Sequence, residues 1–180
     1  MRTLIIHPED NTTCFLKTIY DGLSDIDLIT DNNTPNSIIK EAIKSHERII
    51  LLGHGTEYGL FSGQNPNTHR FDRIMVDCKH VQLLRNKEII AIWCNANIFG
   101  EKYGLNGLFS GMVISELEES IDCGVQTTQS ELDLENIKFA ENLRHCLDNY
   151  ELSAIPSEFI KLNSANTQLT DFNYNSLYML

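Results

Sequence analysis

The sequence predicts an α/β fold in which a mostly parallel central sheet lies between two layers of helices. Two observations predict this fold class. Short apolar, β-rich runs alternate along the chain with segments of helical periodicity, an order typical of β-α-β units. The 180 residues also fit one domain, 1–180, which is long enough to bury a core without disulfides or metal ions. Right-handed crossovers between parallel strands then place helices on both faces of the sheet, which gives three layers.

Three strands and two helices are expected in the first third of the chain. Between the first two strands, Phe15, Ile19 and Leu23 recur at helical spacing. Thr34 and Pro35 supply an N-cap and a first-turn proline for the next helix. The three strands are TLIIH (3–7), DIDLIT (25–30) and ERIILLGHG (47–55).

The middle of the chain continues the alternation. Residues 59–75 are rich in turn formers, so a surface loop or small hairpin is expected there. Helical density resumes from 77 to 85, and EIIAIWCNA (88–96) is apolar enough to be a central fourth strand. The segment 104–116 is expected to hold a short helix and then a fifth strand at about 111–116.

A long helix and a distinct tail complete the expected architecture. Ser130 and Asp133 form a capping-box pattern before this helix. The tail, 163–180, is rich in Asn, Thr and Ser but closes on apolar and aromatic residues, so we expect a docked segment or an edge strand. The apolar stripe of the long helix consists of Leu132, Ile137, Ala140, Leu143 and Leu147.

The formal net charge of the chain is −11. This acidic balance disfavours nucleic acid and anionic membrane surfaces as partners, and it favours a cationic substrate. The sequence contains no apolar run of about 20 residues, the length that a membrane-spanning helix needs. The N-terminal MRTLIIHPED lacks the pattern of a signal peptide, so we expect a cytoplasmic protein without membrane contact.

The cysteines do not suggest disulfides or a metal centre. Their number is odd and no CxxC spacing occurs, so reduced thiols are expected. Neither zinc-ligand spacing nor a glycine-rich nucleotide loop is present, and we therefore expect no metal and no organic cofactor. The five residues are Cys14, Cys78, Cys94, Cys123 and Cys146.

Two chemically active side chains follow the third and fourth strands. In open α/β sheets the functional crevice lies at the carboxyl ends of the strands. The third strand ends at His54, between two glycines, and the fourth ends at Cys94. If these strands pair, a base and a nucleophile project from one edge of the sheet, as cysteine hydrolysis requires. The N–H groups of Gly55 and Cys94 are candidate oxyanion donors. A packed His54 and an inert core Cys94 are the alternative.

These motifs resemble the signature of the caspase-like (clan CD) cysteine peptidases, the group of caspases, gingipains, separases and CHAT-domain proteins. WCNANIFGEKYGLNGLFSGMVISELEES is similar to the CHAT and separase pattern, in which the catalytic cysteine leads into a helix, a glycine-containing turn and a strand. The resemblance covers about residues 47–120. It implies a caspase-like domain with His54 as general base or acid, Cys94 as nucleophile, and the Gly55 and Cys94 amides as oxyanion donors. Trp93 is bulkier than the usual residue before the nucleophile.

Acidic residues follow the expected fifth strand. In relatives that cleave after arginine or lysine, a carboxylate in this region receives the basic side chain, and such pairing gives geometric selectivity. A solvated acidic loop in an acidic protein is the alternative. The candidate substrate-binding residues are Glu116, Glu118, Glu119 and Asp122.

The sequence therefore predicts a cysteine endopeptidase that cleaves a peptide or protein substrate through an acyl-enzyme and prefers basic residues. A catalytically inactive caspase-like binding or scaffold module is the first alternative. A flavodoxin-like domain in which His54 is incidental is the second. The sequence does not indicate an oligomeric state.

Overall fold

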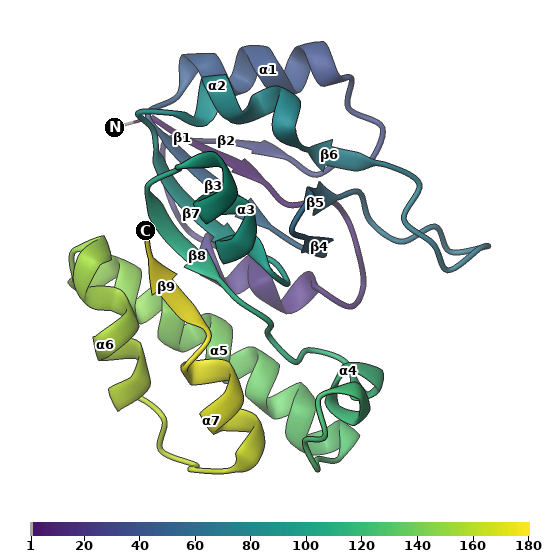
Figure 1. The fold of residues 1–180 in the computed structure, drawn as a ribbon, viewed down its shortest axis with the longest axis vertical. Helices are drawn as coiled ribbons and strands as arrows, with labels where there is room; N and C mark the ends of the chain where they lie inside the picture. Colours follow the sequence, from purple (N-terminus) through teal and green to yellow (C-terminus); the bar gives the residue numbers. More distant parts are fainter. Residues whose placement is uncertain (1) are drawn as a thin grey trace.

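Six strands form the central sheet of the computed structural model, which describes residues 2–180 (Figure 1). These strands are β1 (Thr3–Ile6), β2 (Ile26–Ile29), β3 (Arg48–Leu52), β7 (Glu88–Ile92), β8 (Gly107–Ser110) and β9 (Leu177–Met179). Their order across the sheet is β2-β1-β3-β7-β8-β9. The first five in this order run parallel, and only β9, at the edge, is antiparallel to its neighbour. The mostly parallel sheet confirms the predicted fold class.

Successive residues of each inner strand face opposite sides of the sheet. In β3, Ile49 and Leu51 belong to one apolar core, whereas Ile50 and Leu52 belong to the other. Each of these four residues is at most 3% exposed. Parallel strands of this kind have continuous apolar sequences because both faces of the sheet are covered by helices.

Helices cover both faces, which gives the three layers visible in Figure 1. The principal covering helices are α1 (Asn36–Ser45), α2 (Val81–Leu84), α3 (Ala96–Tyr103), the 3-10 helix η1 (Cys14–Ile19), α5 (Gln129–Asn149) and α6 (Ile155–Lys161). The first three pack on one face, where Phe99 of α3 is fully buried. The last three pack on the other face, where Phe139 of α5 is 1% exposed.

A second, smaller sheet follows β3 and lies outside the main layers. It is antiparallel with the order β4-β5-β6, where β4 is Gly55–Thr56, β5 is Gly59–Phe61 and β6 is Ile74–Val76. The β4–β5 hairpin begins slightly before the segment in which a loop or small hairpin was expected. The remaining elements are η2 (Cys78–His80), α4 (Leu117–Asp122), η3 (Leu152–Ala154) and α7 (Gln168–Tyr174).

The expected position of the fifth strand, 111–116, is wrong. Helix α3 begins at Ala96, after the residues 93–95 that follow the end of β7, and ends at Tyr103; Gly104 is its C-cap, with a positive φ of 61°. Strand β8 therefore starts earlier in the chain. The segment 111–116 is a loop. The backbone N–H and carbonyl of Ile114 form hydrogen bonds with a side chain and not with a neighbouring strand. Asn173 of α7 accepts from the N–H of Ile114 at 2.8 Å and donates to its carbonyl at 3.0 Å.

The start and buried face of α5 also differ from expectation. Thr128 is the N-cap and forms the capping box with Glu131, so the Ser130 and Asp133 assignment is wrong. Ile137 is 48% exposed. The buried face recurs at spacings of three and four residues from Leu132, and position 137 lies off that stripe because it is five residues away.

The tail, 163–180, contains α7 and the edge strand β9. Residue Phe109 of β8 pairs with Tyr178 of β9 in the antiparallel register. The backbone N–H of Gly111 donates to the carbonyl of Ser176 at 2.7 Å, which continues this connection past the end of β8. The tail thus fastens the loop that follows β8.

We expect Ile90→Ala to lower the free energy of unfolding by about 2–5 kcal/mol, because Ile90 of β7 is fully buried and truncation leaves a cavity. Urea unfolding followed by circular dichroism measures the change. Ile137→Ala is the matched control and should change stability by about 0.5 kcal/mol or less, because that side chain is half exposed on α5. Equal losses for the two variants would contradict the assigned burial.

Candidate active site

The pairing of β3 with β7 brings the two predicted catalytic residues to one edge of the sheet. Leu52 and Ile92 are partners in this parallel register, and the N–H of Gly53 donates to the carbonyl of Ile92 at 3.1 Å. His54 and Cys94 each lie two residues beyond the paired strand ends. Both line the same cavity of about 20 Å³, room for roughly one water molecule. The structure therefore places the imidazole and the thiol around one small space.

A strand–turn–helix connection presents Cys94. Asn95 has a positive φ of 67° and is the N-cap of α3, and its N–H donates to the carbonyl of Gly111 at 3.1 Å. Trp93, on the other side of Cys94, is 2% exposed, and its indole N–H donates to the carbonyl of Thr56 at 3.0 Å. These contacts fix the backbone on both sides of the thiol.

Gly55 is required by the close approach of Trp93. A Cβ atom at position 55 would lie 2.3 Å from Cδ1 of the indole, a distance that no side chain tolerates. Because Phe61 donates to the carbonyl of His54 at 2.8 Å, the next pair, Gly55 with Leu60, is a non-hydrogen-bonded pair of the hairpin. The N–H of Gly55 thus points away from β5 and is not used by the β4–β5 hairpin.

A hydrogen-bonded chain fixes the ring of His54. Nε2 lies 2.5 Å from the hydroxyl oxygen of Thr12, and that hydroxyl donates to Oδ1 of Asp10 at 2.7 Å. The hydroxyl has one proton, so it must accept from Nε2. Nε2 is therefore the protonated nitrogen, and Nδ1 carries the free lone pair of the neutral ring.

Asp10 is well suited to support this chain. Its side chain is 5% exposed and also accepts from the N–H of Gln64 at 2.6 Å and from the N–H of Thr12 at 2.9 Å. Burial acts to raise its pKa, but these hydrogen bonds and the nearby His54 together lower the pKa below its usual value. Asp10 therefore remains a carboxylate that accepts the hydrogen bond from Thr12 behind the imidazole.

Cys94 is held as a thiol. Its Sγ lies 3.7 Å from the carbonyl oxygen of Val113 and 3.7 Å from Oε1 of Glu119. Burial, followed by the charge of Glu119, raises the pKa of Cys94 to about 12. In this conformation the sulfur is protonated at neutral pH and contacts a carboxylate.

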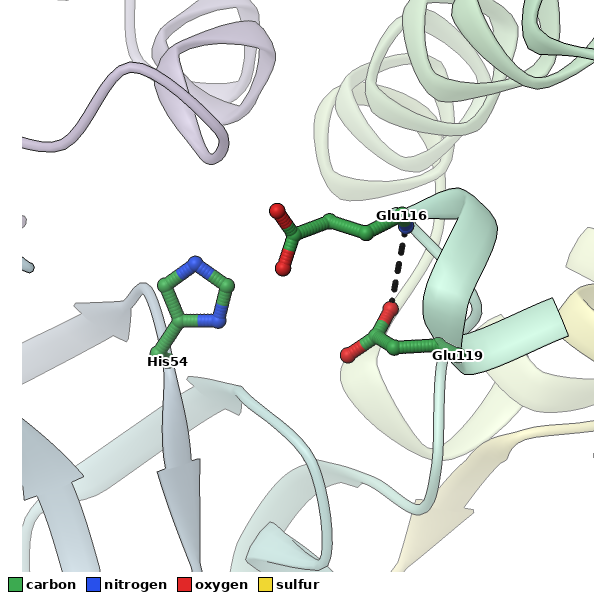
Figure 2. Close-up of side chains that lie close together, drawn as sticks. All are labelled: His54, Glu116 and Glu119. Carbon is green, nitrogen blue, oxygen red and sulfur yellow. Dashed lines mark hydrogen bonds between the residues drawn. The ribbon is translucent and has the colours of Figure 1, made fainter. Parts of the chain in front are cut away.

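Glu119 is locked in place by the loop that precedes α4. Its Oε2 accepts from the N–H of Ser115 at 2.8 Å, from the Ser115 hydroxyl at 3.1 Å and from the N–H of Glu116 at 3.1 Å. The last of these bonds is the dashed line in Figure 2. The remaining oxygen, Oε1, is the one that contacts Cys94.

Glu116 completes a group of three polar side chains. Figure 2 shows His54 rising from the end of its strand to face Glu116 and Glu119, which extend from the start of α4. One ligand-type atom from each residue lies within 4.8 Å of the other two. Burial raises the pKa of Glu116, while proximity to His54 partly opposes that shift. Two of the four predicted substrate-binding acids therefore converge on the predicted dyad.

The other two acids, Glu118 and Asp122, are exposed on α4. Glu118 and Glu116 line a neighbouring cavity of about 480 Å³, which Asp122 does not line. Asp133 of α5 also lines this cavity, and Thr12 connects its wall to the ring of His54. The cavity thus presents three carboxylates beside the dyad.

The other histidines near cysteines have local structural contacts. His7 lies 3.0 Å from the hydroxyl of Tyr20, and burial lowers its pKa to about 4, so it is neutral at physiological pH. His80 forms a capping box with Asp77 at the start of η2. His145 is exposed on α5.

Sequence reasoning missed Asp10 and Thr12, and it did not assign Glu119 to Cys94. The rule for strand ends could have found the first two residues, because Asp10 and Thr12 follow the carboxyl end of β1, which lies beside β3 in the sheet. The position of Glu119 depends on the loop 111–116, which was expected to be a strand. No sequence pattern indicated its approach to Sγ.

Comparisons with known proteins add no family assignment. No protein-family model matches the chain, and no curated protein matches it.

Within residues 2–180, none of the helices combines the length and the apolar character needed to cross a membrane.

We expect Glu119→Gln to lower the pKa of Cys94, because an amide no longer opposes the thiolate with negative charge. Alkylation of Cys94 by iodoacetamide, followed by mass spectrometry across about pH 7 to 10, measures the thiolate fraction. The variant should react faster at every pH below the native pKa. Glu118→Gln, on the exposed side of α4, should leave the rate unchanged, and a slower reaction in Glu119→Gln would refute the electrostatic role.

Proposed function

We propose that the chain is a cysteine endopeptidase of caspase-like type in which His54 and Cys94 form the catalytic dyad. One observation carries this proposal: both residues follow the in-register strands β3 and β7 and line one small cavity. The resemblance of the HG and WCNA motifs to caspase-like peptidases supports the same assignment. The buried Asp10 supports it further, since a carboxylate behind the imidazole stabilises the charged ring.

In the proposed reaction, the Cys94 thiol transfers its proton to Nδ1 of His54 while its sulfur attacks the peptide carbonyl. The carbonyl electron pair moves to oxygen, and the N–H groups of Gly55 and Cys94 donate to this oxyanion. Collapse of the intermediate breaks the C–N bond, and the leaving amine takes the proton from His54. A water molecule then gives a proton to His54 and attacks the thioester. The peptide acid leaves, and the proton returns to sulfur.

In the proposed mechanism, the observed conformation of Cys94 is a resting state for this chemistry. The thiol faces Val113 and Glu119, and its raised pKa keeps it protonated. Attack therefore requires Sγ to rotate away from Oε1 of Glu119 toward the imidazole. Such a rotation removes the contact with the carboxylate, and pairing with an imidazolium lowers the pKa of a cysteine.

The cavity of about 480 Å³ supports a preference for substrates with a basic side chain before the cleaved bond. Glu116, Glu118 and Asp133 line it, and among residues 2–180 no lysine, arginine or histidine does. A guanidinium that enters this cavity gains charge-assisted hydrogen bonds close to the dyad. The net charge of −11 acts in the same direction, because it attracts cationic peptides and repels nucleic acid.

A catalytically inactive binding module of the same fold is the second candidate. The pKa of about 12 and the contact with Glu119 favour it, because a permanently protonated, carboxylate-bound thiol is a poor nucleophile. The acidic cavity would then hold a basic peptide without cleaving it. Labelling of Cys94 separates the two candidates.

We expect a peptidyl acyloxymethyl ketone with arginine at its reactive end to label Cys94 faster than the other four cysteines. His54→Ala should slow this labelling by about 100-fold or more, since general-base assistance is lost. Mass spectrometry of the labelled chain measures both effects. His145→Ala, an exposed histidine on α5, should label at the native rate. Equal labelling of all five cysteines would exclude the peptidase and support the binding module.

We expect Glu116→Gln to lower cleavage after arginine by about tenfold relative to cleavage after an uncharged residue, because one charge-assisted contact is lost. Fluorogenic peptides that differ only at that position measure the ratio of kcat/KM values. Asp122→Asn should leave the ratio unchanged, since Asp122 does not line the cavity. Preferential cleavage after aspartate would exclude basic specificity.

A further inference from the structure

We infer that His54, Glu116 and Glu119 form a binding site for one divalent transition-metal ion, with Zn²⁺ as the class of ion that fits best. Ligand-type atoms of the three side chains lie within 4.8 Å of one another. One imidazole nitrogen and two carboxylate oxygens are a ligand set that Zn²⁺ accepts. Figure 2 shows the three side chains directed toward a common space between the end of β3 and the start of α4.

The imidazole is oriented as metal-ligating histidines are. Nε2 donates to Thr12, which in turn donates to the buried Asp10, so the ring is fixed and its lone pair lies on Nδ1. Metal ligands of this type commonly donate their second ring N–H to a carboxylate or another acceptor, which fixes the tautomer and raises ligand basicity. Figure 2 shows one ring nitrogen turned toward Glu119.

Glu119 is also oriented before any ion binds. Its Oε2 is occupied by three hydrogen bonds from Ser115 and Glu116. The other oxygen is free of these backbone contacts and points toward His54 in Figure 2. One ligand atom is thus positioned by a loop whose conformation does not depend on the metal.

The charge of the site lacks a cationic partner. Within residues 2–180, Glu116 and Glu119 form no ion pair with lysine or arginine, and Asp10 adds a third carboxylate 3.9 Å from Nε2 of His54. Carboxylates grouped in this way repel one another. A divalent cation between them and the imidazole would remove that repulsion.

The geometry requires only a small adjustment. Ligand atoms at about 2.0–2.2 Å from a tetrahedral Zn²⁺ lie about 3.4 Å apart, so atoms that lie within 4.8 Å of one another must approach by at most about 1.4 Å. Glu116 is half-buried and can supply part of this movement by side-chain rotation. Three protein ligands leave one position of a tetrahedral site open. The sulfur of Cys94 lies 3.7 Å from Oε1 of Glu119.

Metal binding and the proposed peptidase chemistry would compete for one atom. Nδ1 of His54 is the metal ligand in one case and the acceptor of the Cys94 proton in the other. Zn²⁺ would therefore inhibit labelling of Cys94, and this consequence alone rests on the proposed function. Binding of the ion does not rest on it.

Isothermal titration of the full chain with Zn²⁺ tests the site. The parent protein for this titration has the substitutions Cys14→Ser and Cys78→Ser. They remove the two exposed thiols, which would otherwise compete for zinc. We expect one equivalent of Zn²⁺, with affinity lowered at least about tenfold by His54→Ala and by Glu119→Gln. Asp122→Asn, on the same helix but outside both the cluster and the acidic cavity, should bind as tightly as the parent. Circular dichroism of each variant verifies the fold.

A second measurement tests the role of the positioning residue Thr12. Thr12→Val should weaken Zn²⁺ binding by about tenfold without touching the ion, and Thr12→Ser, which keeps the hydroxyl, should restore it. Unchanged affinity in both His54→Ala and Glu119→Gln, or no uptake by the parent, would overturn the site. Zn²⁺ binding without selective labelling of Cys94 would overturn the peptidase alone, and selective labelling without binding would overturn the metal site alone.

Discussion

The parallel pairing of β3 with β7 is the constraint on which the site depends. Because Leu52 and Ile92 are register partners, the two strands end together and their following residues occupy one edge. A one-residue slip would reverse the faces of all later side chains in a strand buried on both sides. The two apolar cores oppose such a slip, since Ile50 and Ile90 would exchange places with residues shaped for the opposite layer.

Two carboxylates act on the two halves of the site in different ways. Asp10, through Thr12, fixes the orientation and tautomer of the His54 ring. Glu119 disfavours a negatively charged sulfur at Cys94. The first arrangement leaves the lone pair of Nδ1 free, and the second keeps the sulfur protonated.

The alternation of strands and helices was predictable because apolar runs and helical periodicity are local signals. The positions of His54 and Cys94 at one edge followed from the rule for strand ends and from the pairing of two central strands. The loop 111–116 could not be predicted, because its backbone partner is Asn173, more than fifty residues away. The approach of Glu119 to the thiol depends on that loop and was hidden for the same reason.

The two hydrogen bonds between Asn173 and Ile114 join segments that lie far apart in the sequence and so affect the order in which the chain folds. The loop 111–116, which leads to Glu119 in α4, is hydrogen-bonded to α7 and, through Gly111, to the residue before β9. Contacts of such long sequence separation form late, since the intervening chain must close first. During synthesis, His54 and Cys94 can therefore come together on a partly built sheet before the acidic loop arrives beside them.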